Sequence, residues 1–332
     1  MMHVFNGDSM SPIFAASGMP GTPVVYADAL LEGPVPEGLS DEAMLRLRQA
    51  FWRGPDPPEQ QADEKGVLAQ WQRNLDSFSG HDEVILWFEH DLFDQLLLIR
   101  HLDWFARRRG GPRTFSLICV GSFAGIEPFK GLGQLTPDQL MSLLDTRAAI
   151  TQAQFDLAQR AWAAFTAADP RFIEQLLAGD TSALPFLAPA LRRWLEEFPA
   201  VRSGLPRSER EILTLLLDAP RSTWSLFHEW ARREDALCPT DTALAGALDR
   251  LTSSSPPLVR VDANAPADPA SVRSRMALPR GTVAITDTGR DVLAGRTDWL
   301  DLRPVDRWMG GVHLTNASMW RWDSAEARIV PR

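Results

Sequence analysis

The sequence has little cysteine, lysine or tyrosine, and it contains no long hydrophobic run. Two cysteines, Cys119 and Cys238, are too few for a disulfide scaffold or a four-cysteine zinc site. No stretch approaches the roughly 18 consecutive apolar residues that a membrane-spanning helix needs. The first residues also lack the basic start and apolar core of a secretory signal. We therefore expect a cytoplasmic protein that makes no membrane contact.

The charge balance restricts the partners that the chain can bind. Its 332 residues carry 34 basic and 43 acidic side chains, a net charge of −9, which disfavours a broad surface that follows nucleic-acid phosphates. All but two of the basic residues are arginine, a bias typical of GC-rich coding sequences, so arginine enrichment alone indicates no function. The length predicts two or three folding units.

Apolar strands alternate with helices over residues 1–125. Strands are predicted at His3–Asn6, Thr22–Ala27, Glu83–Phe88 and Thr114–Val120. The last two are continuous apolar runs, as in strands that are buried on both faces. Strand–helix–strand repeats of this kind predict an α/β fold with a Rossmann-like parallel sheet and covering helices.

The rest of the chain predicts three further segments. Residues 126–200 form a helical middle segment. Residues 201–298 contain three helices followed by two strands, the layout of a winged-helix-like domain. These helices are predicted at Ser208–Leu217, Trp224–Arg233 and Thr240–Leu251, and the strands at Leu258–Val261 and Thr282–Ile285. Residues 299–332 are rich in tryptophan and predict a tail packed on the body of the protein.

Three stretches of the first segment resemble a known family. They are His3–Ser9, Glu32–Pro36 and Trp87–Gln95. Together they resemble the bacterial family catalogued as domain of unknown function eighteen thirty-five, over residues 1 to about 125. The helical stretch near 136–200 is similar to the segment that often follows that domain. The family has no established activity, so the resemblance implies a bacterial α/β protein and no reaction.

Polar side chains and two glycines follow the predicted strands, at the sheet edge where parallel sheets bind ligands. They are Asn6, Gly7, Asp8 and Ser9 after the first strand, Asp28 and Glu32 after the second, Glu89, His90, Asp91, Asp94 and Gln95 after the third, and Gly121 after the fourth. Crowded carboxylates are unfavourable unless a cation compensates them. Oxygen ligands suit Mg²⁺ or Mn²⁺. We therefore expect a metal site formed by Asp8, Asp28, Glu89 and Asp91.

A purely structural interpretation of these residues stays open. Asp and Ser commonly cap helices, and acidic residues in a first turn complement the helix dipole. Asp91 could cap the helix that follows it, and Asp8 or Ser9 the first helix. His90 and Asp94 lie four residues apart, so they could form a metal-binding pair, a proton-transferring pair or an ordinary structural hydrogen bond.

Two candidates for ligand binding lie outside this set. Lys130 falls in a stretch with glycines at 121, 125, 131 and 133, which predicts a flap that brings the lysine to a phosphate or carboxylate. A solvated surface lysine is the alternative. His313 follows Gly310 and Gly311, which allow the backbone to approach a site closely.

These observations favour a metal-assisted hydrolase or transferase that acts on a phosphorylated or nucleotide-like small molecule. Catalysis would then rest on Glu89, His90, Asp91 and Asp94. The alternative is a ligand-sensing regulator that uses the winged helix to contact DNA or a protein. Residues 201–298 carry 13 basic and 13 acidic side chains, which favours a protein partner or a homodimer over DNA. Three wing arginines keep DNA a candidate: Arg273, Arg275 and Arg280.

Overall fold

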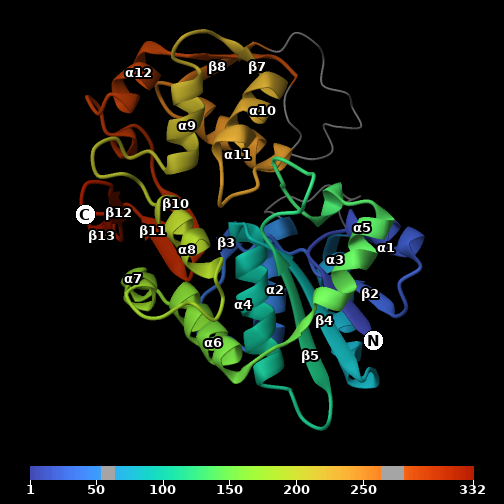
Figure 1. Cartoon of the computed structure of the whole chain (residues 1–332). Coiled ribbons are helices and arrows are strands. Elements are labelled where there is room, and N and C mark those ends of the chain that lie inside the picture. Colours follow the sequence, from blue (N-terminus) through green and yellow to red (C-terminus); the bar gives the residue numbers. More distant parts are fainter. Residues whose placement is uncertain (54–63, 263–279) are drawn as a thin grey trace. The chain divides into compact units, whose positions relative to one another are not determined.

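The computed structural model describes residues 1–53, 64–262 and 280–332, and divides the chain into two compact units (Figure 1). Unit 1 contains Met1–Leu191 and Trp308–His313, and unit 2 contains Arg192–Arg307 and Leu314–Arg332. The mixed α/β structure confirms the predicted fold class at this level. No helix in the described ranges is long and apolar enough to cross a membrane.

Unit 1 is built on a five-stranded, mostly parallel sheet with the strand order β2-β1-β4-β5-β6. Its strands are β1 (Met2–Phe5), β2 (Thr22–Val25), β4 (Glu83–Glu89), β5 (Thr114–Val120) and the antiparallel β6 (Ala148–Ala149). The four longer strands confirm the prediction. Residues 84–88 of β4 are fully buried, which explains their unbroken apolar run.

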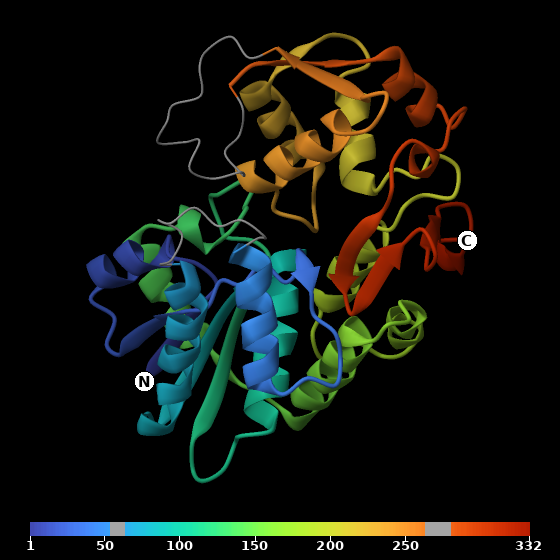
Figure 2. The same ribbon diagram turned by 180° about the vertical axis from the view of Figure 1, so that it is seen from behind.

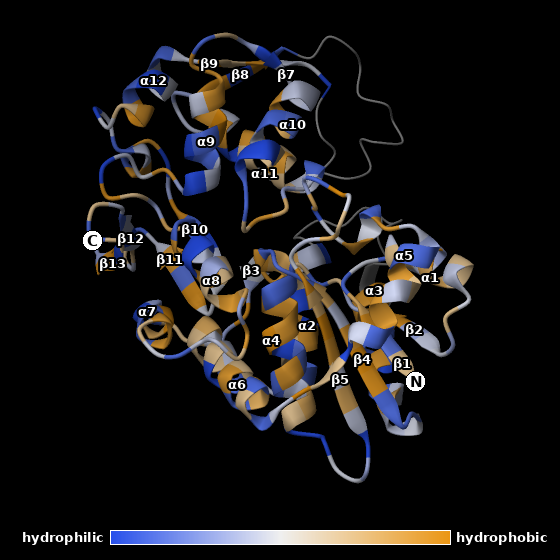
Figure 3. Cartoon of the chain, viewed as in Figure 1, coloured by the Kyte–Doolittle hydropathy of each residue, from blue (hydrophilic) through white to orange (hydrophobic). Residues whose placement is uncertain are grey.

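Helices cover both faces of this sheet. On one face α1 (Met10–Ser17) and α5 (Pro137–Leu143) share a core with the β1 and β4 residues Phe5, Ile85 and Trp87. On the other face α4 (Leu92–Ala106) and α6 (Gln152–Thr166) meet the rings of Phe88 and Phe115. Hydrophobic residues accordingly run along β4, β5 and α4 (Figure 3).

The connection from β2 to β4 contains α2 (Asp41–Arg53) and α3 (Glu64–Asp76), and both views place α2 next to α4 (Figure 1 and Figure 2). Ser40, Thr136 and Thr151 cap α2, α5 and α6 through their side chains, as residues of these types do at helix starts. The short helices of unit 1 are η2 (Ser77–Gly80), η3 (Leu132–Gln134), η4 (Leu144–Thr146) and α7 (Arg171–Leu177).

The tryptophan-rich tail forms strands, which the sequence did not predict. A three-stranded sheet has the order β11-β10-β3, with β3 (Gly33–Pro34), β10 (Asp306–Gly310) and β11 (Val312–Thr315). The Val35 N–H donates to the Gly310 carbonyl (2.8 Å) and the Gly311 N–H to the Phe165 carbonyl (3.0 Å), so this segment completes unit 1. An antiparallel hairpin follows, formed by β12 (Trp320–Asp323) and β13 (Arg328–Pro331).

Unit 2 contains a second, smaller α/β core. Its elements are α9 (Arg207–Leu215), β7 (Arg221–Ser222), α10 (Thr223–Arg233), α11 (Asp241–Thr252), β8 (Val259–Asp262), β9 (Thr282–Ile285), α12 (Asp287–Leu293) and η5 (Trp299–Asp301). The three strands form an antiparallel sheet in the order β7-β9-β8. Leu213, Trp230, Leu248 and Val283 are buried between the helices and this sheet. The boundary between the two units falls within the helix α8 (Leu187–Leu195), after Leu191.

Candidate metal centre

The polar groups predicted after β4 lie at the point where the strand order of the sheet reverses. The helix that follows β1 covers one face and the helix that follows β4 covers the other, so the chain turns in opposite directions from two neighbouring strands. In the register of this parallel pair Phe5 lies beside Trp87. Asn6 and Glu89 therefore share one sheet edge. Such a switch point is where open α/β sheets bind their ligands.

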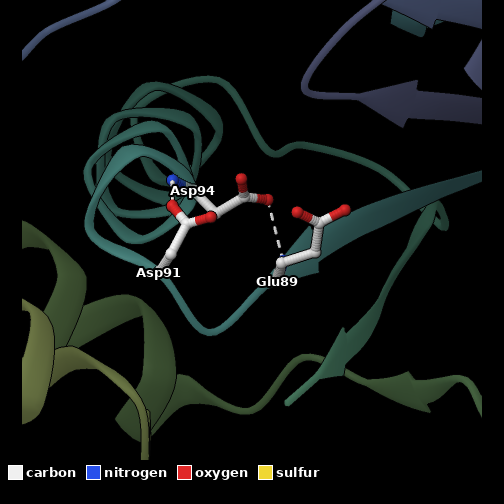
Figure 4. A group of neighbouring side chains, drawn as sticks. All are labelled: Glu89, Asp91 and Asp94. Carbon is white, nitrogen blue, oxygen red and sulfur yellow. Dashed lines mark hydrogen bonds between the residues drawn. The ribbon is translucent and has the colours of Figure 1, made fainter. Parts of the chain in front are cut away.

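Three buried carboxylates form the centre of this site, and we call Glu89, Asp91 and Asp94 the acidic triad (Figure 4). One oxygen from each lies within 4.8 Å of the others. Their side chains come from the last residue of β4, the N-cap of α4 and the first turn of that helix. The exposed fractions are 6%, 3% and 1%, so water compensates little of their charge.

Hydrogen bonds hold each member of the triad in place. The Glu89 N–H donates to Asp94 Oδ1 (2.8 Å), and the Asp94 N–H donates to Asp91 Oδ1 (3.1 Å), which is the N-cap of α4. Asn6 Nδ2 donates to Asp94 Oδ2 (2.7 Å), which connects β1 to the triad. The Leu132 N–H donates to Glu89 Oε1 (2.5 Å) from the loop after β5. These donors are dipoles, so they orient the three oxygens without neutralising the charge.

Burial raises the pKa values of all three triad residues, and repulsion from the other carboxylates adds to the rise for Glu89 and Asp94. Burial raises the pKa of Glu89 to about 7, and the neighbouring Asp91 adds to the rise. Burial, followed by the charges of Asp91 and Glu89, raises the pKa of Asp94 well above its usual range. Burial also raises the pKa of Asp91. The hydrogen bond from the Asp94 amide and the charges of the nearby His90 and Lys130 side chains lower this pKa, but burial has the larger effect. In the absence of a cation the triad therefore holds protons near neutral pH.

The donor set suits a hard divalent cation. Three carboxylates are oxygen ligands, which Mg²⁺ and Mn²⁺ prefer over softer metals. A cation at their common point would stabilise the ionised forms that burial disfavours. The coarse prediction of an acidic cluster that could hold a metal is thus confirmed by the geometry.

The loop after β5 closes over the triad and requires glycine at one position. Gly131 has φ +155°, and a Cβ there would lie 2.6 Å from Glu89 Oε2. The adjacent Lys130 is half-buried, and its backbone N–H donates to Gln134 Oε1 (2.5 Å). Glycine therefore lets this backbone reach a carboxylate, as the glycine-rich stretch suggested.

His90 lies beside the triad without belonging to it. Its ring meets that of Phe186 edge to face at 6.1 Å, and its Cβ is 3.4 Å from the position of a Cβ on Gly121. The ring is not one of the groups whose ligand atoms converge among the described residues. His90 and Gly121 therefore line the surroundings of the site together.

The structure does not bring Asp8 or Asp28 to the triad. Asp28 is buried in a two-bond pair with Arg48, through Nε to Oδ2 (2.9 Å) and Nη2 to Oδ1 (2.6 Å), and it also accepts from Trp52 Nε1 (2.9 Å). A guanidinium therefore already compensates this carboxylate. Asp8 is exposed, so water compensates its charge and no shared cation is needed to offset repulsion from other carboxylates.

The remaining predicted residues lie outside the acidic triad. Gln95 Nε2 donates to the Glu89 carbonyl (2.6 Å), and the Glu32 carbonyl accepts from Arg48. Gly7 accepts from the Met10 N–H in the turn before α1, where Ser9 makes no side-chain cap bond. His313 on β11 stacks on Trp308 of the neighbouring strand β10, with ring centroids 4.3 Å apart.

Two groups that shape this region gave no usable signal in the sequence. The Leu132 N–H is a backbone donor, and its residue type says nothing about its direction. Arg48 sits in an ordinary amphipathic helix among many other arginines. Only the fold shows that it meets Asp28.

The chain matches no model of a known protein family, and its sequence is not significantly similar to any curated protein.

Proposed function

We propose that the acidic triad binds Mg²⁺ or Mn²⁺ and supports hydrolysis or group transfer on a phosphorylated or nucleotide-like substrate. The observation that carries this proposal is the convergence of three buried carboxylates within 4.8 Å of one another. A bound divalent cation polarises a phosphoryl oxygen and neutralises developing charge.

Capping alone does not account for the arrangement. The N-cap of α4 needs one carboxylate oxygen, which Asp91 supplies to the Asp94 N–H. Glu89 lies before the helix, yet its carboxylate turns toward the other two and is held there by the Leu132 N–H. Burying two more carboxylates than a cap requires is unfavourable unless a ligand uses them.

Two neighbouring side chains favour a phosphorylated substrate. Lys130 is near enough to act on the charge of Asp91, so a substrate phosphate at the rim of the site would meet its positive charge. His90, between Gly121 and Phe186, is placed to accept or donate a proton beside the cation.

The direct test is calorimetric titration of Mn²⁺ into the wild type and Asp94→Asn. We expect a single saturable site in the wild type and at least about a tenfold weaker one in the variant, because the substitution removes one charged ligand. Asp138→Asn, which changes a first-turn acid of α5, is the matched control and should bind like the wild type. A phosphatase and phosphodiesterase panel with Mn²⁺ then tests the reaction. Equal Mn²⁺ affinity in all three proteins would remove the basis of the proposal.

A regulator remains the second candidate because of the element order in unit 2. The order α9-β7-α10-α11-β8-β9, with an antiparallel sheet β7-β9-β8, supports the predicted winged-helix-like domain. The third helix, α11, carries Asp241 and Asp249 beside Arg250, and Arg250 Nε donates to Glu209 (2.7 Å). This charge pattern favours a protein partner or a homodimer over DNA. Of the wing arginines, Arg273 and Arg275 lie outside the described residues.

Electrophoretic mobility shift with the chain's own upstream DNA, at several salt concentrations, separates these partners. We expect weak binding with a shallow salt dependence. Tight binding whose affinity falls steeply with salt would show many phosphate contacts and favour the DNA-binding regulator.

A further inference from the structure

Asn6 follows the last residue of β1, and its side chain is directed at the acidic triad. β1 lies between β2 and β4 in the sheet, and Phe5 pairs with Val25 on one side and with Trp87 on the other. The backbone before Asn6 is therefore held from both sides. Side chains alternate between the two faces of a strand. Phe5 packs on the face that carries α1, so the side chain of Asn6 lies on the face that carries α4.

The carboxamide of Asn6 contacts two of the three carboxylates. Its Nδ2 lies 2.7 Å from Asp94 Oδ2, to which it donates a hydrogen bond. The Asn6 side chain also hydrogen-bonds Glu89, and this contact lowers the pKa of that carboxyl against the larger effect of burial. Asn6 is half-buried and is more exposed than any member of the triad. A neutral polar group therefore reaches the triad from a strand that supplies none of its carboxylates.

A carboxamide in this position can act as a donor to the carboxylates or as a ligand to a cation. Nδ2 and Oδ1 occupy equivalent positions at the end of a planar group, so a half-turn about the last side-chain bond exchanges them. A cation bound by the triad would repel the Nδ2 hydrogens and attract Oδ1. Carbonyl oxygens are ordinary ligands of hard divalent cations. A cation should therefore turn Oδ1 of Asn6 toward the triad.

The distances require no movement of β1 for Asn6 to become a ligand. Mg²⁺ binds oxygens at about 2.1 Å in an octahedron, so neighbouring ligand atoms lie about 3.0 Å apart and opposite ones about 4.2 Å apart. The 2.7 Å between Asn6 Nδ2 and Asp94 Oδ2 is close to the first distance. The ligand atoms of the triad lie within 4.8 Å of one another, which is near the second distance. The half-turn of the carboxamide is therefore the main change that ligation needs.

The neutrality of Asn6 suits the charge of a divalent cation. The triad contributes three negative charges, which exceed the charge of Mg²⁺ or Mn²⁺ by one. An aspartate at position 6 would bring the total to four, and a trivalent cation would compensate that total better. The number of charged ligands is one of the properties that set the affinity of an oxygen site.

We propose that Asn6 is a fourth protein ligand of the cation at the acidic triad, binding through Oδ1, and that its neutrality favours divalent over trivalent ions. This ligand set rests on the proposed metal centre and adds a residue after β1 to those from β4 and α4. The alternative is a positioning residue that only donates from Nδ2. An ionised aspartate at this position can bind a cation but cannot donate, so it separates the two roles.

The test is calorimetric titration of Mn²⁺ at pH 7.5 into the full-length wild type, Asn6→Ala and Asn6→Asp. Asn6→Ala lacks the ligand and should bind at least about tenfold more weakly than the wild type. Asn6→Asp should bind at least as tightly as the wild type, because a carboxylate oxygen replaces the carboxamide oxygen. La³⁺ should gain more affinity from this variant than Mn²⁺ does. Ser122→Asp, which adds the same charge at an exposed position after β5, is the control and should bind both ions like the wild type.

Thermal melts with and without saturating Mn²⁺ give a second measurement, which decides the question if Asn6→Ala does not fold. A fourth carboxylate adds to the repulsion, so Asn6→Asp should melt below the wild type without metal. Mn²⁺ should then raise its melting temperature by more than it raises that of the wild type. A residue that only donates would instead leave Asn6→Asp with a smaller response to Mn²⁺ than the wild type has.

Three results would overturn the role of Asn6 as a ligand. They are weaker Mn²⁺ binding in Asn6→Asp than in the wild type, a loss of less than about tenfold in Asn6→Ala, and a gain in La³⁺ affinity that is equally large in Ser122→Asp. With Mn²⁺ still bound by the wild type, each result leaves the acidic triad intact as a metal centre. A wild type that binds no Mn²⁺ overturns the metal centre and this ligand together.

Discussion

Asp91 has two roles in this structure, and two substitutions separate them. Its carboxylate caps α4 by accepting from the Asp94 N–H, and it is also a member of the acidic triad. Asparagine caps helices as well as aspartate does, whereas alanine does not. We expect Asp91→Asn to melt at or above the wild-type temperature, because it relieves repulsion, while losing Mn²⁺ binding.

Asp91→Ala should lose Mn²⁺ binding too, and it should be about 1 kcal/mol less stable than Asp91→Asn because the cap is lost. Thermal melts with and without Mn²⁺ measure both effects. If the melting temperature of Asp91→Asn falls as far as that of Asp91→Ala, and Mn²⁺ does not change the melting temperature of the wild type, Asp91 has a structural role only.

The pH dependence of stability follows from the pKa of Glu89. Folding raises this pKa from 4.5 to about 7, so between these two pH values the folded chain holds a proton that the unfolded chain has released. The free energy of unfolding therefore falls as pH rises through this range. This contribution of Glu89, on the order of 3 kcal/mol without metal, is complete below about pH 4.5 and is lost as pH rises through about 7.

Urea unfolding of the wild type and Glu89→Gln between pH 4.5 and 8 isolates this contribution. The variant cannot titrate at this position, so the difference between the two proteins should change across the range. Saturating Mn²⁺ should reverse the trend, because the cation binds the ionised carboxylates. A constant difference between the two proteins would mean that Glu89 is already ionised at pH 4.5.

At the scale of elements, the long strands were predictable and the short ones were not. The strand Glu83–Glu89 is buried from Val84 onward, and burial requires an apolar run that is visible in the sequence. The two-residue strands Gly33–Pro34 and Ala148–Ala149 carry no periodic pattern. Their pairing depends on partners that only the fold supplies.

The candidate site, like the strands, was predictable only in part. Glu89, Asp91 and Asp94 could be placed together because they follow one strand within six residues. Asp28 could not be separated from them by its position, since it too follows a parallel strand. Its role depends on Arg48, which lies 20 positions later on a helix and takes its charge. Strand order predicts where carboxylates gather, and the surrounding helices determine which of them stay uncompensated.

Buried ion pairs connect three elements of unit 2. Arg193 on α8 donates to both oxygens of Glu234, to Glu197 (2.7 Å) and to Ser208 on α9 (3.0 Å). Burial alone would raise the pKa of Glu197, but the charges of Arg193 and Arg307 and the hydrogen bonds from Arg193 and Ser208 together outweigh it and lower that pKa to about 2. We expect Arg193→Met to lower the free energy of unfolding by about 3–5 kcal/mol, because it removes the buried cation that the two carboxylates share. The arginines that remain, Arg207 and Arg307, lie farther from Glu234 and Glu197 (3.6 and 3.7 Å).

The control for this prediction is Arg296→Met, which removes an exposed arginine that pairs with Asp291. Its loss should be about 1 kcal/mol or less. Urea unfolding at pH 7 measures both. The stabilisation from the ionised Glu197 is present above pH 4.5 and is lost as pH falls toward its folded pKa of about 2, so the two variants should differ less in acid. Equal losses at pH 7 would show that the buried pairs contribute no more than a surface pair.

At the scale of the whole molecule, unit 1 is completed by residues more than a hundred positions away in the sequence. The chain leaves unit 1 after Leu191, and Trp308–His313 then belongs to it again. Met309 pairs with Gly33, and both Met309 and Val312 are buried. A fragment that ends at residue 200 would therefore lack part of this unit, which the predicted domain limits did not indicate.

Within the returning segment Trp308–His313, Gly311 is the position where a single substitution should disturb unit 1 most. Its N–H donates to the Phe165 carbonyl (3.0 Å), and a Cβ at this position would overlap the carbonyl oxygen of Thr166. Backbone atoms cannot turn away as a flexible side chain can, so Gly311→Ala must displace the strand from α6. We expect a loss of at least about 2 kcal/mol in the free energy of unfolding, at the upper end for an overpacked position.

Gly110→Ala is the matched control, because a Cβ at Gly110 meets nothing within 4 Å and neither glycine has a left-handed backbone. Gly110→Ala should unfold at the same urea concentration as the wild type or at a slightly higher one, since alanine reduces the conformational freedom of the unfolded chain. Urea unfolding of the three proteins, followed by hydrogen exchange, locates the effect. In Gly311→Ala the amides of Val35 and of α6 should exchange faster, because the strand that meets them is displaced. Unchanged exchange at Val35 would mean that β3 keeps its place without the returning strand, and unit 1 would then be complete within its first 191 residues.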